Sequence, residues 1–210
     1  MSILSDTEIL ALINANEFQL NPLVLNCIQP SSIDLTLAKN IEIIAGNGRL
    51  DLSNPKDPHA LSSLVKKEEI QEEGFELLPG TMILGYTAEE LTFTSQINGR
   101  ICNRNSLARW GLDTALGHYI NPGFKGKMPL VIRNVGPLKL VLHAGMKICQ
   151  LEVHRLEQKA LREYNERHNV NKIEPAIPAS WEVKLQKELE NTDHSLSDYL
   201  HDRIEENRGR

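Results

Sequence analysis

Several features that would point to a secreted, membrane-bound or metal-binding protein are scarce in this chain. The three cysteines, Cys27, Cys102 and Cys149, are odd in number and far apart, which is typical of reduced core thiols. They argue against a disulfide framework and against a zinc site. No apolar run is long enough to span a membrane, and the N-terminus has no basic region followed by an apolar one. We therefore expect a cytoplasmic protein that has no membrane partner.

Basic charge is also in short supply. The chain has 23 Lys and Arg residues against 28 Asp and Glu residues, so its net charge is −5. This balance argues against nucleic acid as a partner. A hydrophobic content of 40% and a charged content of 24% are otherwise ordinary for a soluble globular protein. The 210 residues suffice for one domain with a sizeable core, with or without an appendage.

Short apolar segments separated by Gly, Pro and Asn follow one another along most of the chain. This spacing is typical of an all-β sandwich or a barrel-like core. Ser5 and Glu8 have the pattern of a helix capping box, and apolar residues at helical spacing follow them. Residues 54–73 contain two prolines and mixed charge, which indicates a surface excursion with weak helix. The predicted fold class is mostly β, a distorted barrel or sandwich with a short N-terminal helix.

The sequence changes character after Glu157. Residues 158–167 favour helix, and residues 169–178 form a linker with two prolines. Beyond the linker, apolar residues four apart, such as Trp181, Leu185 and Leu189, predict amphipathic helices. We predict a first domain over residues 1–157 and a helical C-terminal extension over residues 158–210. The extension is expected to pack on its own domain or on a neighbouring subunit.

Three segments carry groups that could line a nucleotide pocket. The segment Arg104–Leu112 packs two arginines, an amide and a hydroxyl into its first six residues, which suits an anion such as phosphate. The segment Ile120–Lys127 is a turn with Pro and Gly that opens into a strand. The segment Ala144–Leu151 is a strand with one interior amide, Gln150.

Together with Leu4–Asp6 and Gln29–Leu37, these segments resemble the dCTP deaminase family, which shares a fold with the trimeric dUTPases. The resemblance implies a dUTPase-like fold and a homotrimer with pockets at subunit interfaces. It also implies a hydrolase that converts dCTP and water to dUTP and ammonia. The implied ligand is a deoxynucleoside triphosphate, dCTP or dUTP. Mg²⁺ would be bound through the triphosphate, without a direct protein ligand.

The resemblance assigns the phosphates to four residues of these segments. Arg104, Ser106 and Arg109 match the phosphate-contacting segment, and Gln150 matches a phosphate-facing glutamine of the dUTPase-like strand. For the two arginines, an ordinary surface salt bridge is the alternative. For Gln150, the alternative is a cross-link between strands.

Phe124 and Asp34 also match positions of the nucleotide site. Phe124 matches an aromatic residue that packs under the deoxyribose, and core packing is the alternative. Asp34 matches an aspartate near the triphosphate and its magnesium. Strand alternation by itself describes Asp34 only as an exposed aspartate.

The groups that deamination requires are altered. The reaction needs a base to deprotonate water and an acid for the leaving amine. Zinc deaminases use an H-x-E and a P-C-x-x-C motif, and this chain has neither. The resemblance implies instead a glutamate on the strand after the Gly turn, and the matching residue is Val131. Strand alternation places Val131 on the face opposite Leu130 and Ile132. A valine offers no proton transfer.

Three further positions bear on activity. Asn105 replaces the first serine of the family's arginine-serine-serine, and Asn121 replaces the aspartate before Pro-Gly. Asparagine cannot act as a base at neutral pH. His118 is a candidate base or a structural histidine of the turn. We expect a nucleotide-binding protein whose deaminase activity is reduced or lost. The alternative is a catalytically inactive deoxynucleotide sensor or a protein-interaction and assembly module.

Overall fold

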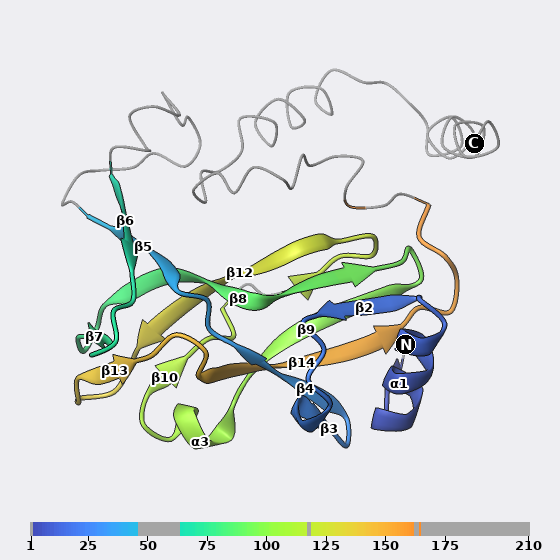
Figure 1. Cartoon of the computed structure of the whole chain (residues 1–210), viewed down its shortest axis with the longest axis horizontal. Coiled ribbons are helices and arrows are strands. Elements are labelled where there is room, and N and C mark those ends of the chain that lie inside the picture. Colours follow the sequence, from blue (N-terminus) through green and yellow to red (C-terminus); the bar gives the residue numbers. More distant parts are fainter. Residues whose placement is uncertain (1, 46–63, 117–118, 162–163, 165–210) are drawn as a thin grey trace, which may run out of the picture. The chain divides into compact units, whose positions relative to one another are not determined.

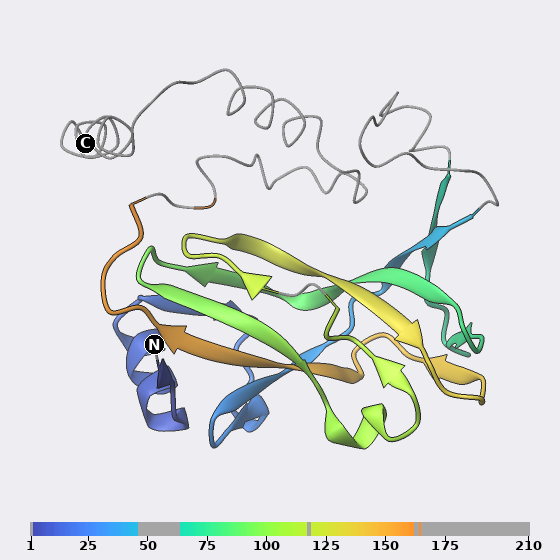
Figure 2. The same ribbon diagram turned by 180° about the vertical axis from the view of Figure 1, so that it is seen from behind.

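The computed structural model describes residues 2–45, 64–116, 119–161 and 164 (Figures 1 and 2). Contacts divide the chain into two units, of which the first comprises residues 1–44 and 66–172. The second unit, residues 45–65 and 173–210, lies almost wholly outside the described residues. His118 and nearly all of the predicted extension over residues 158–210 lie outside them as well. No helix of the described part is long and apolar enough to cross a membrane.

The first sheet is antiparallel and has six strands, with β14 at its centre. Its order is β11 (Tyr119–Ile120), β9 (Ile97–Asn103), β14 (Lys147–Arg155), β4 (Ser32–Thr36) and β3 (Ile28–Gln29), and β1 (Ser2–Ile3) also pairs with β14.

The second sheet also has six strands and is organised around β8. Its order is β10 (Leu112–Asp113), β12 (Lys125–Asn134), β8 (Met82–Phe93), β5 (Asn40–Ile44) and β6 (Val65–Glu69), and β2 (Phe18–Asn21) also pairs with β8. A small sheet of two strands joins β7 (Phe75–Leu77) to β13 (Leu140–Leu142).

The two six-stranded sheets share one hydrophobic core. Ile33 and Leu151 of the first sheet and Leu130 and Ile132 of the second are fully buried in it. The sheets approach so closely that a Cβ on Gly99 of the first sheet would lie 3.1 Å from Phe93 Cζ of the second. Because side chains alternate along a strand, each sheet also has an outer face that points away from this core. The mostly-β prediction is confirmed, and the sheets form an open sandwich, not a closed barrel.

The N-terminal helix α1 (Asp6–Asn14) begins at the predicted capping box. Glu8 N donates to Ser5 Oγ over 3.4 Å, and Ser5 N donates to Glu8 Oε2 over 2.8 Å. The hydrogen bonds that Ser5 N and Ser5 Oγ donate to the Glu8 carboxylate hold its pKa below its usual value. Ile9 and Leu12 are buried, which docks one face of the helix on the sandwich. Two short helices follow, the 3₁₀ helix η1 (Leu25–Cys27) and α3 (Asn105–Ala108).

The long strand β8 contains a bulge. Glu90 pairs with Lys127 and Tyr86 pairs with Pro129, so β8 has extra residues between the two pairs. Thr87 Oγ1 accepts from Met128 N at 2.9 Å and so replaces a ladder hydrogen bond.

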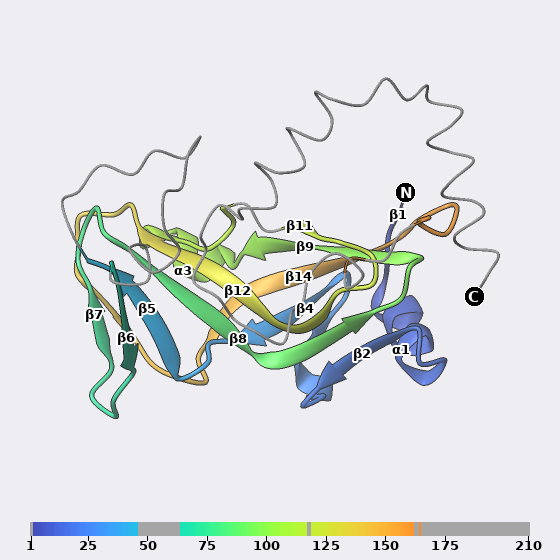
Figure 3. The same ribbon diagram turned by 90° about the horizontal axis from the view of Figure 1, so that it is seen from above.

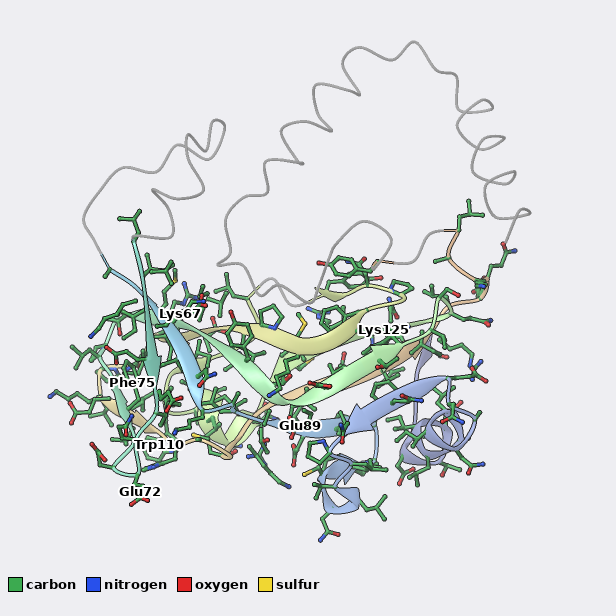
Figure 4. All side chains as sticks on the ribbon, turned by 45° about the horizontal axis from the view of Figure 1, so that its top comes forward. Lys67, Glu72, Phe75, Glu89, Trp110 and Lys125 are labelled. Atoms are coloured by element: carbon green, nitrogen blue, oxygen red, sulfur yellow. The ribbon has the colours of Figure 1, made fainter. Side chains whose placement is uncertain are left out.

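The bulge presents a buried carboxylate to the first sheet. Glu89, labelled in Figure 4, accepts from Thr36 N at 3.0 Å and from Thr36 Oγ1 at 2.7 Å. Thr36 belongs to β4, so this contact ties the two sheets together.

The prediction of weak helix at the end of residues 54–73 is wrong. Residues Val65–Glu69 form the strand β6, beside β5 and β7 at one end of the unit (Figure 3). Lys39 Nζ lies 2.6 Å from Glu69 Oε2, and Lys66 pairs with Glu68. Charged side chains of this kind are typical of an edge strand. Pairing with β5 overrides the local helix propensity.

Candidate functional site

Three predicted site residues, Asp34, Arg104 and Gln150, come together on the outer face of the first sheet. Gln150 of β14 is the register partner of Asp34 on β4 and of Cys102 on β9. Arg104 follows β9 directly and precedes α3. Three segments far apart in the sequence therefore meet because β14 pairs with both β4 and β9.

Asp34 is the centre of this cluster and is only 3% exposed. Its Oδ1 forms an ion pair with Arg104, whose Nε lies 3.2 Å away, and accepts from Gln150 Nε2 at 3.3 Å. Its Oδ2 accepts from Lys147 Nζ at 3.0 Å and from Gln29 Nε2 at 3.4 Å. A buried carboxylate is costly unless donors surround it, and here both oxygens are satisfied. Asp34 is therefore not the exposed aspartate that strand alternation describes.

The cluster has an excess of positive charge. Arg104 and Lys147 are cations and Asp34 is an anion, so these three side chains sum to one positive charge, and the buried Glu89 carboxylate lies nearby on Thr36. The Arg104 side chain is 26% exposed and the Lys147 side chain 38%, so donors of both face solvent. Arg104 also donates from Nη1 to the Lys147 carbonyl oxygen at 3.4 Å, which fixes the two cations side by side. Paired cations with exposed donors suit a phosphate or another anion.

Lys147 was not predicted as a site residue. Simple alternation places Lys147 and Gln150 on opposite faces of a strand, because they are three residues apart. The register of β14 against β4 shifts between Lys147 and Cys149, and this irregularity brings Lys147 to the face of Asp34. An irregularity of this kind depends on the partner strand, so the sequence carries no local signal for it.

Gln150 forms the cross-link between strands that was the alternative for it, and its phosphate role stays a prediction. Its Nε2 lies 3.4 Å from Ser32 Oγ and 3.3 Å from Asp34 Oδ1, so it cross-links β14 to β4. Asp34, which accepts from this amide, also pairs with Arg104 and Lys147. Its side chain is only partly buried.

The remaining residues of the arginine-rich segment lie on α3. Asn105, Ser106 and Arg109 are exposed, and Arg109 follows the last residue of the helix. Within the described part of the chain, the side chains of Ser106 and Arg109 make no hydrogen bond or ion pair. The surface salt bridge considered for Arg109 is therefore not formed with any described residue.

The altered strand position Val131 lies on the other sheet. Leu130 and Ile132 are fully buried, whereas Val131 is half-buried on the outer face, as strand alternation predicted. Arg133 shares this face and its Nη2 lies 3.1 Å from Asp113 Oδ2. A side chain at position 131 thus points away from the core.

The turn before β12 positions Asn121 and Phe124. Phe124 N donates to Asn121 O at 3.2 Å, and Gly123 has a φ of 81°. With Pro122 at the preceding position, this is the geometry of a type II turn. Asn121 is exposed. Phe124 is 5% exposed and its ring lies 5.9 Å from that of Tyr164, so in this chain it packs in the core.

The two halves of the predicted site lie on opposite sides of the sandwich. Asp34 and Gln150 are on the outer face of the first sheet, and Val131 is on the outer face of the second. The shared core lies between them. One copy of the chain therefore does not bring the cation cluster next to Val131.

A directly bound metal ion does not fit the cluster. Asp34 is its carboxylate, and nitrogen donors take both oxygens. A divalent cation on Asp34 would lie against Arg104 and Lys147, which repel it. In residues 2–45, 64–116, 119–161 and 164, no group of three or more His, Cys, Asp or Glu side chains has an arrangement that could hold a metal. The charge and the donors of the cluster suit an anion better than a cation.

The thiols close to the cluster are poor nucleophiles. Burial raises the pKa of Cys149, and the nearby carboxylates Glu89 and Asp34 raise it further. Partial burial and Glu152 raise the pKa of Cys102. Both thiols therefore stay protonated at neutral pH.

Comparisons with known proteins agree with this architecture. A family model described as dCTP deaminase-like matches residues 3–156. A protein of Nocardia farcinica named "dCTP deaminase, dUMP-forming" is 37% identical over 163 residues, covering 77% of this chain and 81% of the relative. A protein of the same name from Corynebacterium diphtheriae is 34% identical over 161 residues, covering 76% of this chain and 85% of the relative.

A solved structure shows the same fold. The crystal structure of 2'-deoxycytidine 5'-triphosphate deaminase from Agrobacterium tumefaciens is similar with a TM-score of 0.56 at 19% sequence identity. The match covers 73% of this chain and 48% of that one, so this chain spans about half the length of that protein. From the family match and the two relatives it follows that the chain belongs to the dCTP deaminase-like family.

Proposed function

We propose that this protein binds a pyrimidine deoxynucleoside triphosphate, with the phosphates on the cluster of Arg104, Lys147 and Gln150. The observation that carries the proposal is the convergence of these donors on the buried Asp34, which leaves one net positive charge. Ser106 on α3 and Arg109, which follows the last residue of α3, add exposed donors close to Arg104 in the sequence. Mg²⁺ reaches the site on the triphosphate and screens its charge there.

We propose further that the complete site lies between copies of the chain in a homotrimer. The cation cluster and Val131 face away from each other in one copy. A nucleotide can touch both only if a neighbour supplies the second face. Light scattering should then give a trimer. A stable monomer near 24 kDa would contradict the shared site and the trimer together.

The residues present support nucleotide binding better than rapid deamination. Deamination of dCTP to dUTP and ammonia needs a base for the attacking water, and Val131 and Asn121 cannot take a proton. Loss of a general base typically costs about two to four orders of magnitude in rate. We therefore propose that deaminase activity is reduced or lost relative to family members that carry a carboxylate at position 131.

The experiment combines binding with turnover. The protein is incubated with dCTP and Mg²⁺, and ammonia, dUTP and dUMP are measured, while thermal unfolding is followed with dCTP, dUTP and deoxycytidine. We expect both triphosphates to raise the melting temperature and the nucleoside to raise it much less. If no deoxynucleotide changes the melting temperature at millimolar concentration, the proposed function is wrong.

A second candidate function is a deoxynucleotide sensor without catalysis. Val131 and Asn121 favour it, because both positions at which the family resemblance implies a carboxylate base are neutral. The sensor predicts stabilisation by dCTP with no ammonia, dUTP or dUMP formed over hours. Slow formation of ammonia in proportion to enzyme concentration contradicts the sensor and supports the residual deaminase.

A further inference from the structure

A buried carboxylate, Glu42, lies in the same cross-strand row as Val131. Leu84 on β8 is the register partner of Val131 on β12 and also of Glu42 on β5. Partners in one row point to the same face of a sheet, here the outer face. The row Glu42–Leu84–Val131 therefore crosses three neighbouring strands on the side away from the core.

Glu42 is 3% exposed, but its hydrogen bonding is incomplete. Lys67 Nζ, on β6 (Figure 4), lies 3.7 Å from Oε1, and the Tyr86 hydroxyl donates to the carboxylate. Burial and the Glu42 carboxylate raise the pKa of Tyr86, so this hydroxyl keeps its proton. Oε2 has no hydrogen-bond partner among the described residues. An unsatisfied buried acceptor is costly, so it calls for a donor from outside this part of the chain.

The residues around Glu42 Oε2 indicate what kind of hydrogen-bond donor would fit there. Leu84 and Tyr86 are buried, Val131 is half-buried, and Met82 and Pro129 are exposed. The row is thus more exposed at Val131 on β12 than at Glu42. A flat ring that enters over Val131 and Leu84 lies on an apolar surface and turns its inner edge toward Oε2. The Lys67 side chain, 69% exposed, is the cover that must move aside.

We propose that Glu42 is a specificity-determining residue that accepts a hydrogen bond from the amino group of a planar heterocycle. The inference rests on the function proposed above, under which this heterocycle is the cytosine of a deoxycytidine nucleotide. Carboxylates accept from the cytosine amino group in known recognition geometry. Uracil has a carbonyl oxygen at that place, which a carboxylate repels. Glu42 therefore selects cytosine over uracil.

The test measures the affinities of dCTP and dUTP, with Mg²⁺, for the full-length protein and its variants by calorimetry. Chromatography checks that the nucleotide is unchanged during each titration. We expect the wild type to prefer dCTP, and Glu42→Ala to weaken dCTP binding about ten- to a hundredfold while dUTP binding is kept. Glu90→Gln is the matched control, because Glu90 is an exposed carboxylate on β8.

Glu42→Gln gives the sharper result because the side chain keeps its size. The Tyr86 hydroxyl donates to the amide oxygen, which leaves the amide NH₂ at the position of Oε2. That NH₂ donates to the uracil carbonyl, so we expect preference to change to dUTP. Adding Tyr86→Phe removes the hydroxyl that holds the amide in one orientation. The amide at position 42 can then present either its oxygen or its NH₂ to the base, so the double variant should bind dCTP and dUTP with similar affinity. Melting temperatures confirm that each variant is folded.

The outcomes separate this inference from the function on which it rests. If the wild type binds neither nucleotide, the proposed function fails and Glu42 has no base to select. If nucleotides bind and the ratio of dCTP to dUTP affinity is the same in wild type, Glu42→Gln and Glu42→Ala, the role of Glu42 is wrong and the proposed function stands.

Discussion

Asp34 and Glu42 are equally buried carboxylates on opposite outer faces of the sandwich, and they differ in what surrounds them. Asp34 receives four nitrogen donors, two of them from cations at 3.2 Å or less. Glu42 has a lysine at 3.7 Å, one tyrosine hydroxyl and an oxygen that has no hydrogen-bond partner in the described part of the chain. Burial therefore does not by itself identify a functional acid. A saturated carboxylate organises its neighbours, whereas an unsaturated one is available to a ligand.

The largest effect that we expect is on the deamination rate, from a substitution on the same outer face as Glu42. Val131→Glu adds a proton acceptor to the row that ends at Glu42, and a general base contributes about two to four orders of magnitude in rate. Ammonia release from dCTP should rise by an amount in this range. Val131→Gln is the control, since it has the same size and takes no proton at neutral pH. An equal rate in both variants would show that position 131 does not face the reacting ring.

Asp34→Asn tests whether the saturated carboxylate organises its cations. The variant keeps the size of the side chain and removes the charge that Arg104 and Lys147 share. Removing one partner of a fully buried ion pair costs about 3–5 kcal/mol, and the cost here should be smaller because the Arg104 and Lys147 side chains are 26% and 38% exposed to water. We expect a corresponding loss of unfolding free energy in urea, measured without ligand. Glu76→Gln, which removes an exposed partner of Lys139, should cost little.

The two arginines of the phosphate segment should separate binding from stability. Arg109 is exposed and has no ion pair among the described residues, so Arg109→Ala should leave the melting temperature and the assembly unchanged. Loss of charge-assisted hydrogen bonds of about 1.5–3 kcal/mol should weaken triphosphate binding by about one to two orders of magnitude. Nucleoside binding should change little.

Arg104→Ala should instead lower both triphosphate affinity and the melting temperature, because Arg104 also pairs with Asp34. At position 109, Arg109→Lys should keep only part of the triphosphate affinity that Arg109→Ala loses, since lysine lacks the planar two-point contact of arginine. If Arg109→Ala changes assembly and leaves the preference for triphosphate over nucleoside intact, Arg109 is a subunit contact.

The smallest effect concerns an exposed carboxylate, which completes the comparison with the two buried ones. The Glu8 side chain caps α1, and hydrogen bonds from Ser5 hold its pKa below its usual value of 4.5. A lowered folded-state pKa means that this stabilisation is present above pH 4.5 and is lost as the pH falls through the lower value. Glu8→Gln should therefore reduce the melting temperature slightly at pH 7 and not at all once Glu8 is protonated. An equal difference at both pH values would contradict the cap.

Features set by neighbouring residues were predictable from the sequence. The capping box needs only Ser5 and Glu8, and the turn needs only Asn121 to Phe124. The burial of Leu130 and Ile132 opposite Val131 follows from the period of a strand. Asp34, Arg104 and Gln150 were expected near one another through the family resemblance, and pairing of β14 with β4 and β9 brings them together.

Features set by pairing between distant strands were decided by the tertiary structure alone. Lys147 joins Asp34 through a register irregularity, and Lys67 reaches Glu42 because β6 is a strand, not a helix. Glu42 shares a row with Val131 because both strands pair with β8 at Leu84. Local sequence determines which side of a strand a residue takes. The register between strands, which determines what it meets there, depends on contacts across the whole core, because a shift of one residue moves every side chain to the other face.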